Sequence, residues 1–236
     1  MKNKTILLKI SGASLVGKDL IISTQNIKEI SLEIKKLTNT NNVGIVCGGG
    51  NIWRGEIGKD LGMNGSVSDN IGMLATMINS LVLAENLNNI ECETKVFSAL
   101  SCSKIMNDFT HHDVNEWFSK PGRVAIFAGG TGLPYFTTDT CAALRAIEIK
   151  ADKVLIGKNG VDGVYSSDPL HDSKAEHYEN LSYDEIIKKD LKVMDQTAIS
   201  LCKENDIELV IFNINDIKNI SKVINNGCKS TIIKNK

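Results

Sequence analysis

Residues 123–150, RVAIFAGGTGLPYFTTDTCAALRAIEIK, form one uninterrupted unit of strand, glycine loop and helix. The run at 123–128, apolar after Arg123, predicts a buried strand, and residues 138–150 place Ala, Leu and Ile at helical spacing. The loop between them contains Gly129, Gly130 and Gly132, a residue type that permits backbone conformations closed to other side chains. A strand that passes through such a loop into a helix is typical of proteins built around a parallel sheet.

The same alternation extends over the whole chain. Further strands are expected at residues 5–10, 43–47, 94–98, 153–156 and 208–212, with a closing strand at 231–234. Helices are expected at 67–87, 195–204 and 216–225. Two more are expected to begin after the cap residue Ser23 and after the capping box at Ser182, and another to end near residue 119. This order predicts a mainly parallel α/β sheet covered on both faces. Ligands bind beyond the carboxyl ends of such strands, and three strands here end in glycine or polar loops.

Composition excludes several classes of protein. The 236 residues are 42% apolar and 23% charged, with a net charge of −1, which excludes a strongly basic nucleic-acid coat and a polybasic membrane patch. The apolar run at 6–8 is too short for a signal peptide, and the run at 71–84 is too short to span a bilayer. The six cysteines show neither C-x-x-C pairs nor zinc spacing. We therefore expect a cytoplasmic protein with reduced cysteines and neither nucleic-acid nor membrane partners.

Two glycine-rich segments fit the common nucleotide-binding patterns only in part. Gly12 to Lys18 fits the first seven positions of the Walker pattern, but Asp19 stands where a magnesium-binding hydroxyl is required. Trp53 occupies the third glycine position of a dinucleotide fingerprint. The segment from Gly48 to Gly55 is left with two interpretations: a tight strand-to-helix turn with a surface arginine, or a phosphate loop in which Arg54 binds phosphate oxygens.

Three further residues, Lys9, Asp139 and Tyr165, each carry two interpretations. Lys9 ends a buried strand, so its ammonium either reaches the surface or meets an anion. Thr138 and Asp139 stand at a helix start that either can cap, and the Asp139 carboxylate is either this cap or an organiser of a catalytic cation. Asp195 also stands at a helix start, where it serves as a cap. Tyr165 is either a ring that stacks on a base or an anchor of its loop. The histidines form no nucleophilic or metal-ligand grouping with Ser, Cys or Asp, which disfavours acyl-transfer chemistry.

Taken in order, several segments resemble the bacterial uridylate kinases of the amino acid kinase superfamily. The resemblance runs from Leu7 to about Ile233 and rests on the ordered set rather than on any one motif. Its segments are Lys9 to Gly12, Gly48 to Gly55, Met63-Asn64 with Asp69, Gly72 to Thr76, Gly129 to Asp139, Leu144 to Glu148, Val161 to Pro169 and Leu191 to Asp195. The resemblance implies a three-layer αβα sandwich with a mainly parallel central sheet, in one domain over residues 1–236. An acceptor lobe would cover about 1–150 and an ATP lobe about 151–236.

The resemblance also implies a reaction and its residues. ATP and UMP would form ADP and UDP with Mg²⁺, as a step of pyrimidine nucleotide supply, in a homohexamer. The catalytic residues would be Lys9, Arg54, Asp139 and Asp195. The ATP residues would be Lys9, Ser11, Gly12, Gly50, Arg54, Asn159, Tyr165 and Asp168. The UMP residues would be Gly49, Asp69, Thr131, Gly132, Leu133, Pro134, Tyr135, Phe136, Thr137 and Thr138. No residue would bind the metal directly, because the nucleotide phosphates would hold Mg²⁺.

Three departures and three alternatives accompany this interpretation. Ala13 stands where the family commonly has Glu, Leu133 where it commonly has Asn, and the segment at 15–23 is shorter than in some relatives. The alternatives are a kinase of an amino acid carboxylate or carbamate, a catalytically silent nucleotide-binding regulator, and a P-loop NTPase built on residues 12–18. The Met-Asn motif with Asp69 disfavours the first alternative, and retention of Lys9 and the two aspartates disfavours the second.

Overall fold

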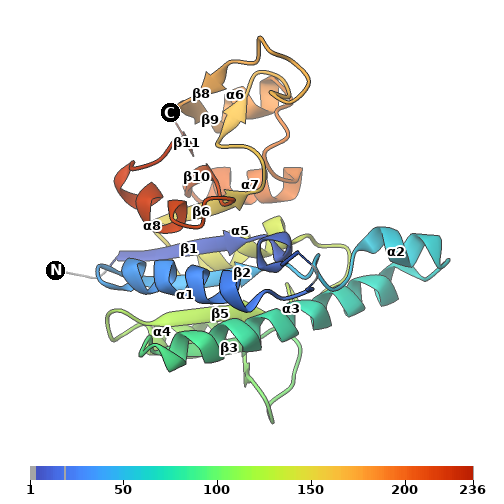
Figure 1. The fold of residues 1–236 in the computed structure, drawn as a ribbon, viewed down its shortest axis with the longest axis vertical. Helices are drawn as coiled ribbons and strands as arrows, with labels where there is room; N and C mark the ends of the chain where they lie inside the picture. Colours follow the sequence, from blue (N-terminus) through green and yellow to red (C-terminus); the bar gives the residue numbers. More distant parts are fainter. Residues whose placement is uncertain (1–3, 19, 236) are drawn as a thin grey trace.

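One large sheet runs through the molecule (Figure 1). The computed structural model describes residues 4–18 and 20–235, so Asp19 lies outside the described residues. The described strands of this sheet lie in the spatial order β4 (Asn107–Asp108), β3 (Thr94–Ser98), β5 (Val124–Ala128), β2 (Asn41–Cys47), β1 (Lys4–Ile10), β6 (Lys153–Lys158), β10 (Glu208–Asn213), β11 (Ser230–Lys234) and β9 (Asn180–Ser182). Two short strands, β7 (Val164–Tyr165) and β8 (His177–Tyr178), pair antiparallel in a separate sheet.

The large sheet is mainly parallel, as the sequence predicts. Every neighbouring pair is parallel except β10 and β11. The strands β5, β2, β1 and β6 therefore end at the same edge, which lies on the right in Figure 1, where α2 projects beyond the sheet. Loops that bind ligands are expected at this edge.

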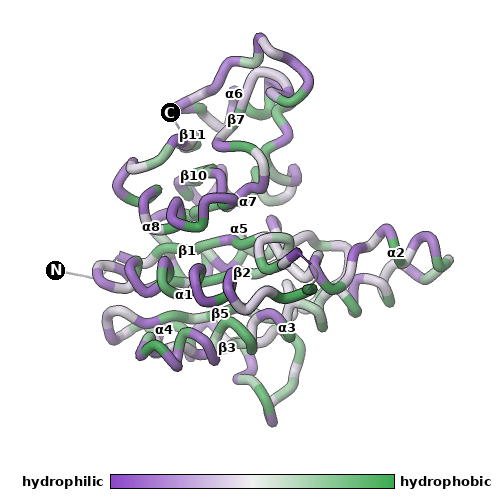
Figure 2. Tube along the Cα trace, in the orientation of Figure 1, coloured by the Kyte–Doolittle hydropathy of each residue, from purple (hydrophilic) through white to green (hydrophobic). Residues whose placement is uncertain are grey.

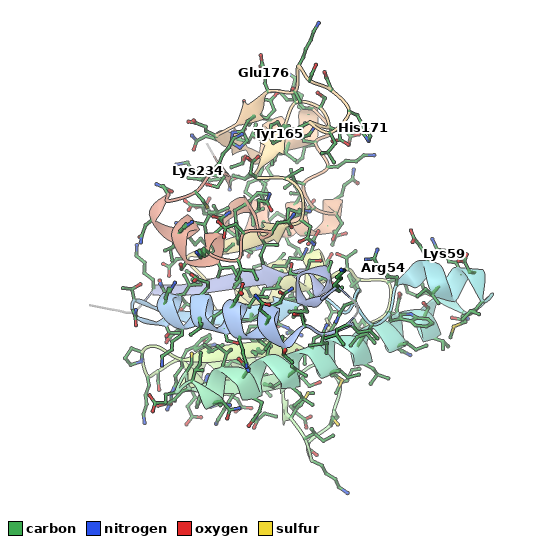
Figure 3. The ribbon with its side chains drawn as sticks, viewed as in Figure 1. Arg54, Lys59, Tyr165, His171, Glu176 and Lys234 are labelled. Atoms are coloured by element: carbon green, nitrogen blue, oxygen red, sulfur yellow. The ribbon has the colours of Figure 1, made fainter. Side chains whose placement is uncertain are left out.

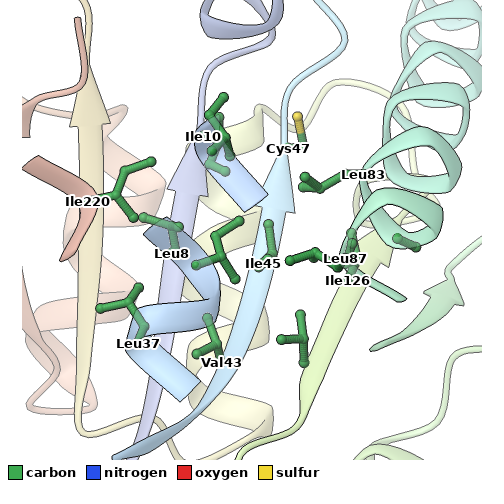
Figure 4. Close-up of a cluster of buried hydrophobic side chains, with 14 of the residues drawn as sticks. Leu8, Ile10, Leu37, Val43, Ile45, Cys47, Leu83, Leu87, Ile126 and Ile220 are labelled. Atoms are coloured by element: carbon green, nitrogen blue, oxygen red, sulfur yellow. The ribbon is translucent and has the colours of Figure 1, made fainter. Parts of the chain in front are cut away.

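Helices cover both faces of the sheet and complete a three-layer sandwich. One layer contains α1 (Thr24–Thr38), α3 (Gly65–Asn89) and α8 (Asn219–Lys222). The other contains α4 (His111–Trp117), α5 (Thr138–Glu148), α6 (Tyr183–Lys188) and α7 (Gln196–Glu204). Apolar residues of the strands alternate between the two cores because successive strand side chains point to opposite faces. Leu8 and Ile45 join the first core, which Figure 4 shows, whereas Leu7 and Val46 join the second.

Hydropathy follows the same layering. The apolar parts of the trace lie along the central strands and the inner sides of the helices (Figure 2). In α1, Ile27, Ile30, Ile34 and Leu37 are all buried, so one face of an amphipathic helix covers β1 and β2. Burial of each such side chain stabilises the fold by about 1.5–3 kcal/mol relative to exposure.

Polar caps fix where several helices begin. The Ser23 hydroxyl accepts from the Asn26 N–H at 3.2 Å, and Ser182 forms a reciprocal capping box with Glu185, both as predicted. The cap of α5, expected at Thr138 and Asp139, is Thr137, whose hydroxyl accepts from the Asp139 and Thr140 N–H groups. Asp139 therefore lies in the first turn of α5 and its carboxylate is not needed as a cap.

Some elements differ from the prediction. The helix expected at 216–225 is the short α8 followed by a 3₁₀ turn at Val223–Asn225. The helix α2 (Gly55–Asp60) was not predicted, because its sequence GEIGKD holds two glycines and lacks an apolar period. Contact with α3 supports α2: a Cβ on Gly58 would lie 2.3 Å from the Ser68 Oγ, so only glycine permits this approach.

The helix α3 is longer than the predicted one. It has 25 residues, a window mean hydropathy of 1.3, and half of that window is buried, so its length and composition would suffice to cross a membrane. Two residues of α3, Leu83 and Leu87, are fully buried in the core, and the helix packs on β3 and β5. The core helix of a globular protein passes the same test of length and composition.

Candidate active site

The loops that follow β1, β2 and β6 meet at the carboxyl edge of the sheet. The Gly48 N–H donates to the Ile10 carbonyl at 2.9 Å, and the Ser14 hydroxyl donates to Asn159 Oδ1 at 3.3 Å. The first two loops touch so closely that a Cβ on Gly12 would lie 2.7 Å from the Gly48 carbonyl oxygen. Such a distance is too short for a real contact, so Gly12 is required for this packing.

A cavity of about 660 Å³ opens between the loops after β1, β2 and β5 and the helices α2 and α3. This volume suits a small-molecule ligand. The structure brings ten of the predicted residues to its wall: Ser11, Gly49, Gly50, Arg54, Asp69, Thr131, Leu133, Phe136, Thr137 and Thr138. We call this cavity the first cavity.

Adjacent glycines in its wall have different surroundings. A Cβ on Gly49 would lie 2.8 Å from the Gly72 carbonyl oxygen and 2.9 Å from the Ala75 Cβ, so Gly49 allows α3 to approach. A Cβ on Gly50 would meet nothing within 4 Å. Gly50 is therefore not needed for packing, and its bare backbone leaves space that a ligand can occupy.

Arg54 stands at the start of α2 and reaches back over the glycine loop. Its Nε donates to the Gly50 carbonyl at 3.0 Å, and the side chain is exposed at the mouth of the cavity (Figure 3). Among the described residues its guanidinium forms no ion pair, whereas Arg123 and Arg145 pair with Glu93 and Glu148. Arg54 is thus the arginine with a charge available for an anion.

Asp69 holds the loop that follows β5. Its Oδ2 accepts from the Tyr135 N–H at 2.8 Å, although the two residues lie on different walls. Tyr135 has a positive φ of 68°, uncommon for a large side chain, and the residue is 74% exposed. The contribution of Tyr135 is therefore its backbone N–H, while its ring packs beside Gly65 and away from the cavity wall.

Lys9 and Asp139 form an ion pair at the inner end of this region. Lys9 Nζ lies 3.0 Å from Asp139 Oδ1, and the two side chains are only 12% and 17% exposed. Asp139 Oδ1 is buried, and apart from the Lys9 ammonium it has no polar partner among the described residues. The Lys9 ammonium therefore meets an anion rather than reaching the surface, which is one of the two interpretations that the sequence left open.

Asp195 links α5 to α7. It caps α7 by accepting from the Ala198 N–H at 2.8 Å, and it accepts from the hydroxyls of Thr137 and Thr140. Burial acts to raise the pKa of Asp195, but the hydrogen bonds from Thr137, the Ala198 N–H and Thr140 outweigh it and hold that pKa below its ordinary value. The carboxylate is fixed as an anion between the two helices.

A second cavity of about 540 Å³ lies in the C-terminal half, where β6 and β10 end. Tyr165 and Asp168, two of the residues that the resemblance implies for ATP, line it. The Tyr165 hydroxyl donates to Asp162 and accepts from Lys229 Nζ at 2.9 Å, and its ring packs edge-on against His177 at 5.1 Å. Tyr165 is therefore anchored through its hydroxyl while its ring contributes to the cavity wall.

Eight predicted residues line neither cavity. They are Lys9, Gly12, Gly132, Pro134, Tyr135, Asp139, Asn159 and Asp195. Lys9 and Asp139 lie where the two cavities approach each other. Thr138, which precedes Asp139 in the chain, lines the first cavity. Lys158, whose pKa is affected by the charges of Lys9 and Asp139, lines the second.

Sequence reasoning did not single out several lysines of the cavity walls, Lys59 and Lys158 among them. Lys59 lies on α2, which was not predicted, and it lines the first cavity together with Arg54; both are labelled in Figure 3. Lys158 ends a buried strand, the same signal that singled out Lys9, but it was not used. Outside both cavities one sequence expectation is corrected: the histidines were expected to form no metal-ligand grouping, but His112, Asp113 and Glu116 bring ligand atoms within 4.8 Å of one another at exposed positions of α4.

Comparison with known proteins gives one consistent result. The sequence profile of the amino acid kinase family matches residues 4–213. The uridylate kinase of Ureaplasma parvum serovar 3 is 44% identical over 99% of both chains, and that of Mycoplasmoides gallisepticum is 44% identical over 100% of both. The crystal structure of UMP kinase from Ureaplasma parvum superposes with a TM-score of 0.96, covering 99% of this chain and 100% of that one. The UMP kinase from Bacillus anthracis, 31% identical, gives 0.91 over 100% and 98%.

Proposed function

Because this chain belongs to the amino acid kinase family, among its uridylate kinases, we propose that it phosphorylates UMP to UDP with ATP as the donor. The observation that carries the proposal is the Lys9–Asp139 pair, 3.0 Å apart, set between two cavities that each have room for a nucleotide. UMP occupies the first cavity and the adenosine of ATP the second. The acceptor lobe is then about residues 1–150 and the ATP lobe about 151–236.

The reaction requires the protein to hold the two nucleotides in position and to supply positive charge. A phosphate oxygen of UMP attacks the γ-phosphorus of ATP, a new P–O bond forms, and the bond to the β-phosphate oxygen breaks to release ADP. The attacking oxygen is already largely ionised near neutral pH, since the second pKa of a phosphate monoester is about 6. A general base is therefore unnecessary. Lys9 and Arg54 hold two anions in line and screen the charge that develops between them.

The remaining residues hold the two nucleotides. Gly50, Ser11 and Gly12 form the loop pair beside the ATP phosphates, while Tyr165 and Asp168 frame the adenosine, with Asn159 at the loop junction. On the acceptor side, Gly49, Asp69 and the segment from Thr131 to Thr138 surround UMP. Leu133 is 59% exposed at the rim, so its departure from Asn leaves the inner wall unchanged.

Magnesium fits the donor set that the site offers. Mg²⁺ keeps several waters and prefers phosphate and carboxylate oxygens. Asp195 already accepts hydrogen bonds from two hydroxyls and a backbone N–H, whereas the buried Asp139 Oδ1 makes none of good geometry. Bound to the nucleotide phosphates, Mg²⁺ would supply charge neutralisation, and Asp139 would receive one of its waters. Direct ligation by the protein is not part of this proposal.

Assembly and location follow the same proposal. We expect a homohexamer in the cytoplasm that binds neither nucleic acid nor membranes and supplies pyrimidine nucleotides. The exposed side of α3 carries Val67, Leu74 and Ile78, each about half exposed, and this apolar stripe suits contact between copies. The described cysteines are all free thiols and most are buried, which accords with a reducing compartment.

The test is ADP formation by the purified protein with ATP and Mg²⁺ and each of UMP, CMP, dUMP, AMP and GMP. We expect turnover with UMP and little with the purine monophosphates. Absence of turnover with any nucleotide, in a folded protein that binds ATP, would contradict the proposal and favour the silent regulator. Size-exclusion chromatography with light scattering tests the hexamer separately.

A further inference from the structure

Three lysines line the second cavity, and their surroundings differ. Lys189 is already engaged: its Nζ donates to the Tyr178 hydroxyl at 3.2 Å and lies 4.5 Å from the centre of that ring. Lys192 is exposed to solvent. Lys158 is half-buried at the end of β6, and its ammonium takes part in no hydrogen bond or ion pair with the described residues. It is the lysine of this cavity whose partially buried charge lacks a partner within residues 4–18 and 20–235.

Sheet register places Lys158 relative to Lys9. Lys9 pairs with Ile156 across β1 and β6, so Lys158 lies two residues farther toward the carboxyl edge, roughly 7 Å along the strand. Side chains two residues apart on a strand share a face, and Ile156 belongs to the core beneath α5. Lys158 thus extends on the same side of the sheet as Asp139, which opens α5.

Two neighbouring charges act on Lys158, those of Asp139 and Lys9. Asp139 already pairs with Lys9 at 3.0 Å, so one carboxylate faces two ammonium groups. Asp168 and Asp190 line the same cavity but form no ion pair with Lys158. Burial lowers the pKa of the Lys158 ammonium; the Asp139 carboxylate opposes this shift and the Lys9 charge adds to it. A half-buried ammonium without a counterion is costly in the free protein, and an anion that enters beside it removes that cost.

We propose that Lys158 binds the polyphosphate of the donor nucleotide, at the point where it passes from the second cavity toward Lys9. The inference rests on the proposed function, because it takes the second cavity to hold the adenosine of ATP. Lys158 and Lys9 then contact successive parts of one anion from two adjacent strands. The Ser14–Asn159 hydrogen bond, 3.3 Å long, closes the loops on either side of this path.

The experiment compares ADP with adenosine, which lacks the phosphates, by calorimetric titration. The variant Lys158→Met should weaken ADP binding by roughly 10- to 100-fold, the range for loss of a charge-assisted hydrogen bond, and leave adenosine binding unchanged. Lys158→Arg should keep most of the ADP affinity because the charge is retained. The matched control is Lys153→Met, which removes the same charge from the opposite end of β6, where Lys153 pairs with Glu208 at 2.8 Å.

Two results would overturn the inference. One is ADP affinity within twofold of wild type in Lys158→Met. The other is an equal loss of ADP and adenosine binding, which would mark a structural role. If Lys158→Met does not fold, Lys158→Gln provides the same comparison. Turnover of UMP by the wild-type protein is measured separately, so failure of the proposed function is distinguishable: a protein that binds ADP but forms no UDP still reports on Lys158.

Discussion

Removal of the Lys9 ammonium should affect both catalysis and stability, and the two effects can be separated. In Lys9→Met the Asp139 carboxylate keeps its charge but loses the ammonium 3.0 Å away. Loss of one partner of a buried ion pair costs about 3–5 kcal/mol, whereas an exposed pair contributes under about 1 kcal/mol. With side chains 12% and 17% exposed, this pair lies closer to the buried case. Lys158 remains near Asp139 and reduces the loss.

We therefore expect Lys9→Met to lower the free energy of unfolding by about 2–3 kcal/mol. In a domain of this size, that corresponds to a fall in Tm of roughly 4–12 °C. The double variant Lys9→Met/Asp139→Asn removes both charges, and we expect it to regain at least half of the lost Tm. Neither variant should form UDP at a measurable rate, because the cation that screens the transferring phosphoryl group is absent in both.

Thermal denaturation by calorimetry gives the stabilities, and ADP release with ATP, Mg²⁺ and UMP gives the activities. Asp139→Asn alone completes the cycle and isolates the coupling between the two side chains. A Tm of Lys9→Met equal to that of wild type would show that the pair is not coupled in solution. Substantial turnover by Lys9→Met at saturating substrates would refute its catalytic role.

Three further predictions concern the same edge of the sheet. Thr140→Val removes a donor to Asp195 and should cost about 1.5–3 kcal/mol at neutral pH, whereas Thr140→Ser should cost less. Since the pKa of Asp195 is lowered in the folded protein, this stabilisation is present above the ordinary Asp pKa and is lost as pH falls through the folded pKa. The Tm values of wild type and Thr140→Val should therefore converge in acid. A Tm difference that does not change with pH would contradict this. Gly49→Ala should destabilise the fold by about 1–3 kcal/mol because its Cβ clashes with α3, whereas Gly50→Ala should keep the Tm and raise the KM for ATP. Thermal denaturation and steady-state kinetics of both variants test this prediction. Lys18→Ala should retain turnover because that side chain is exposed, and a collapse of activity would revive the P-loop alternative.

The parts of the fold that the sequence predicts are those governed by local pattern. Apolar runs such as 43–47 are strands because a buried parallel strand needs apolar side chains on both faces. The capping box at Ser182 is likewise a local signal, and the structure confirms it. The glycine loops gather at one edge because parallel strands must end together, so ten predicted residues reach one cavity wall.

The parts that escape prediction depend on contacts distant in sequence. The helix α2 forms on the support of α3, through the glycine at position 58. Thr137 caps α5, and its hydroxyl also donates to Asp195, a partner 58 positions away. The local sequence gives no reason to choose Thr137 over Thr138 or Asp139 as the cap. The hydrogen bond from the Tyr135 N–H to Asp69 is equally non-local, and no local pattern in the sequence indicates it.

The position of β11 between β10 and β9 has a consequence for synthesis of the protein. Strand β9 precedes α6, α7 and β10 in the chain, yet within the described residues it pairs only with β11, which is translated after all of them. While the ribosome is still making β11, β9 has no neighbour in the sheet and one edge of β10 is uncovered. An unpaired edge is where a nascent chain associates with the wrong partner. The C-terminal half, including the wall of the second cavity, therefore closes only when this strand is inserted, whereas β1 to β5 can assemble earlier.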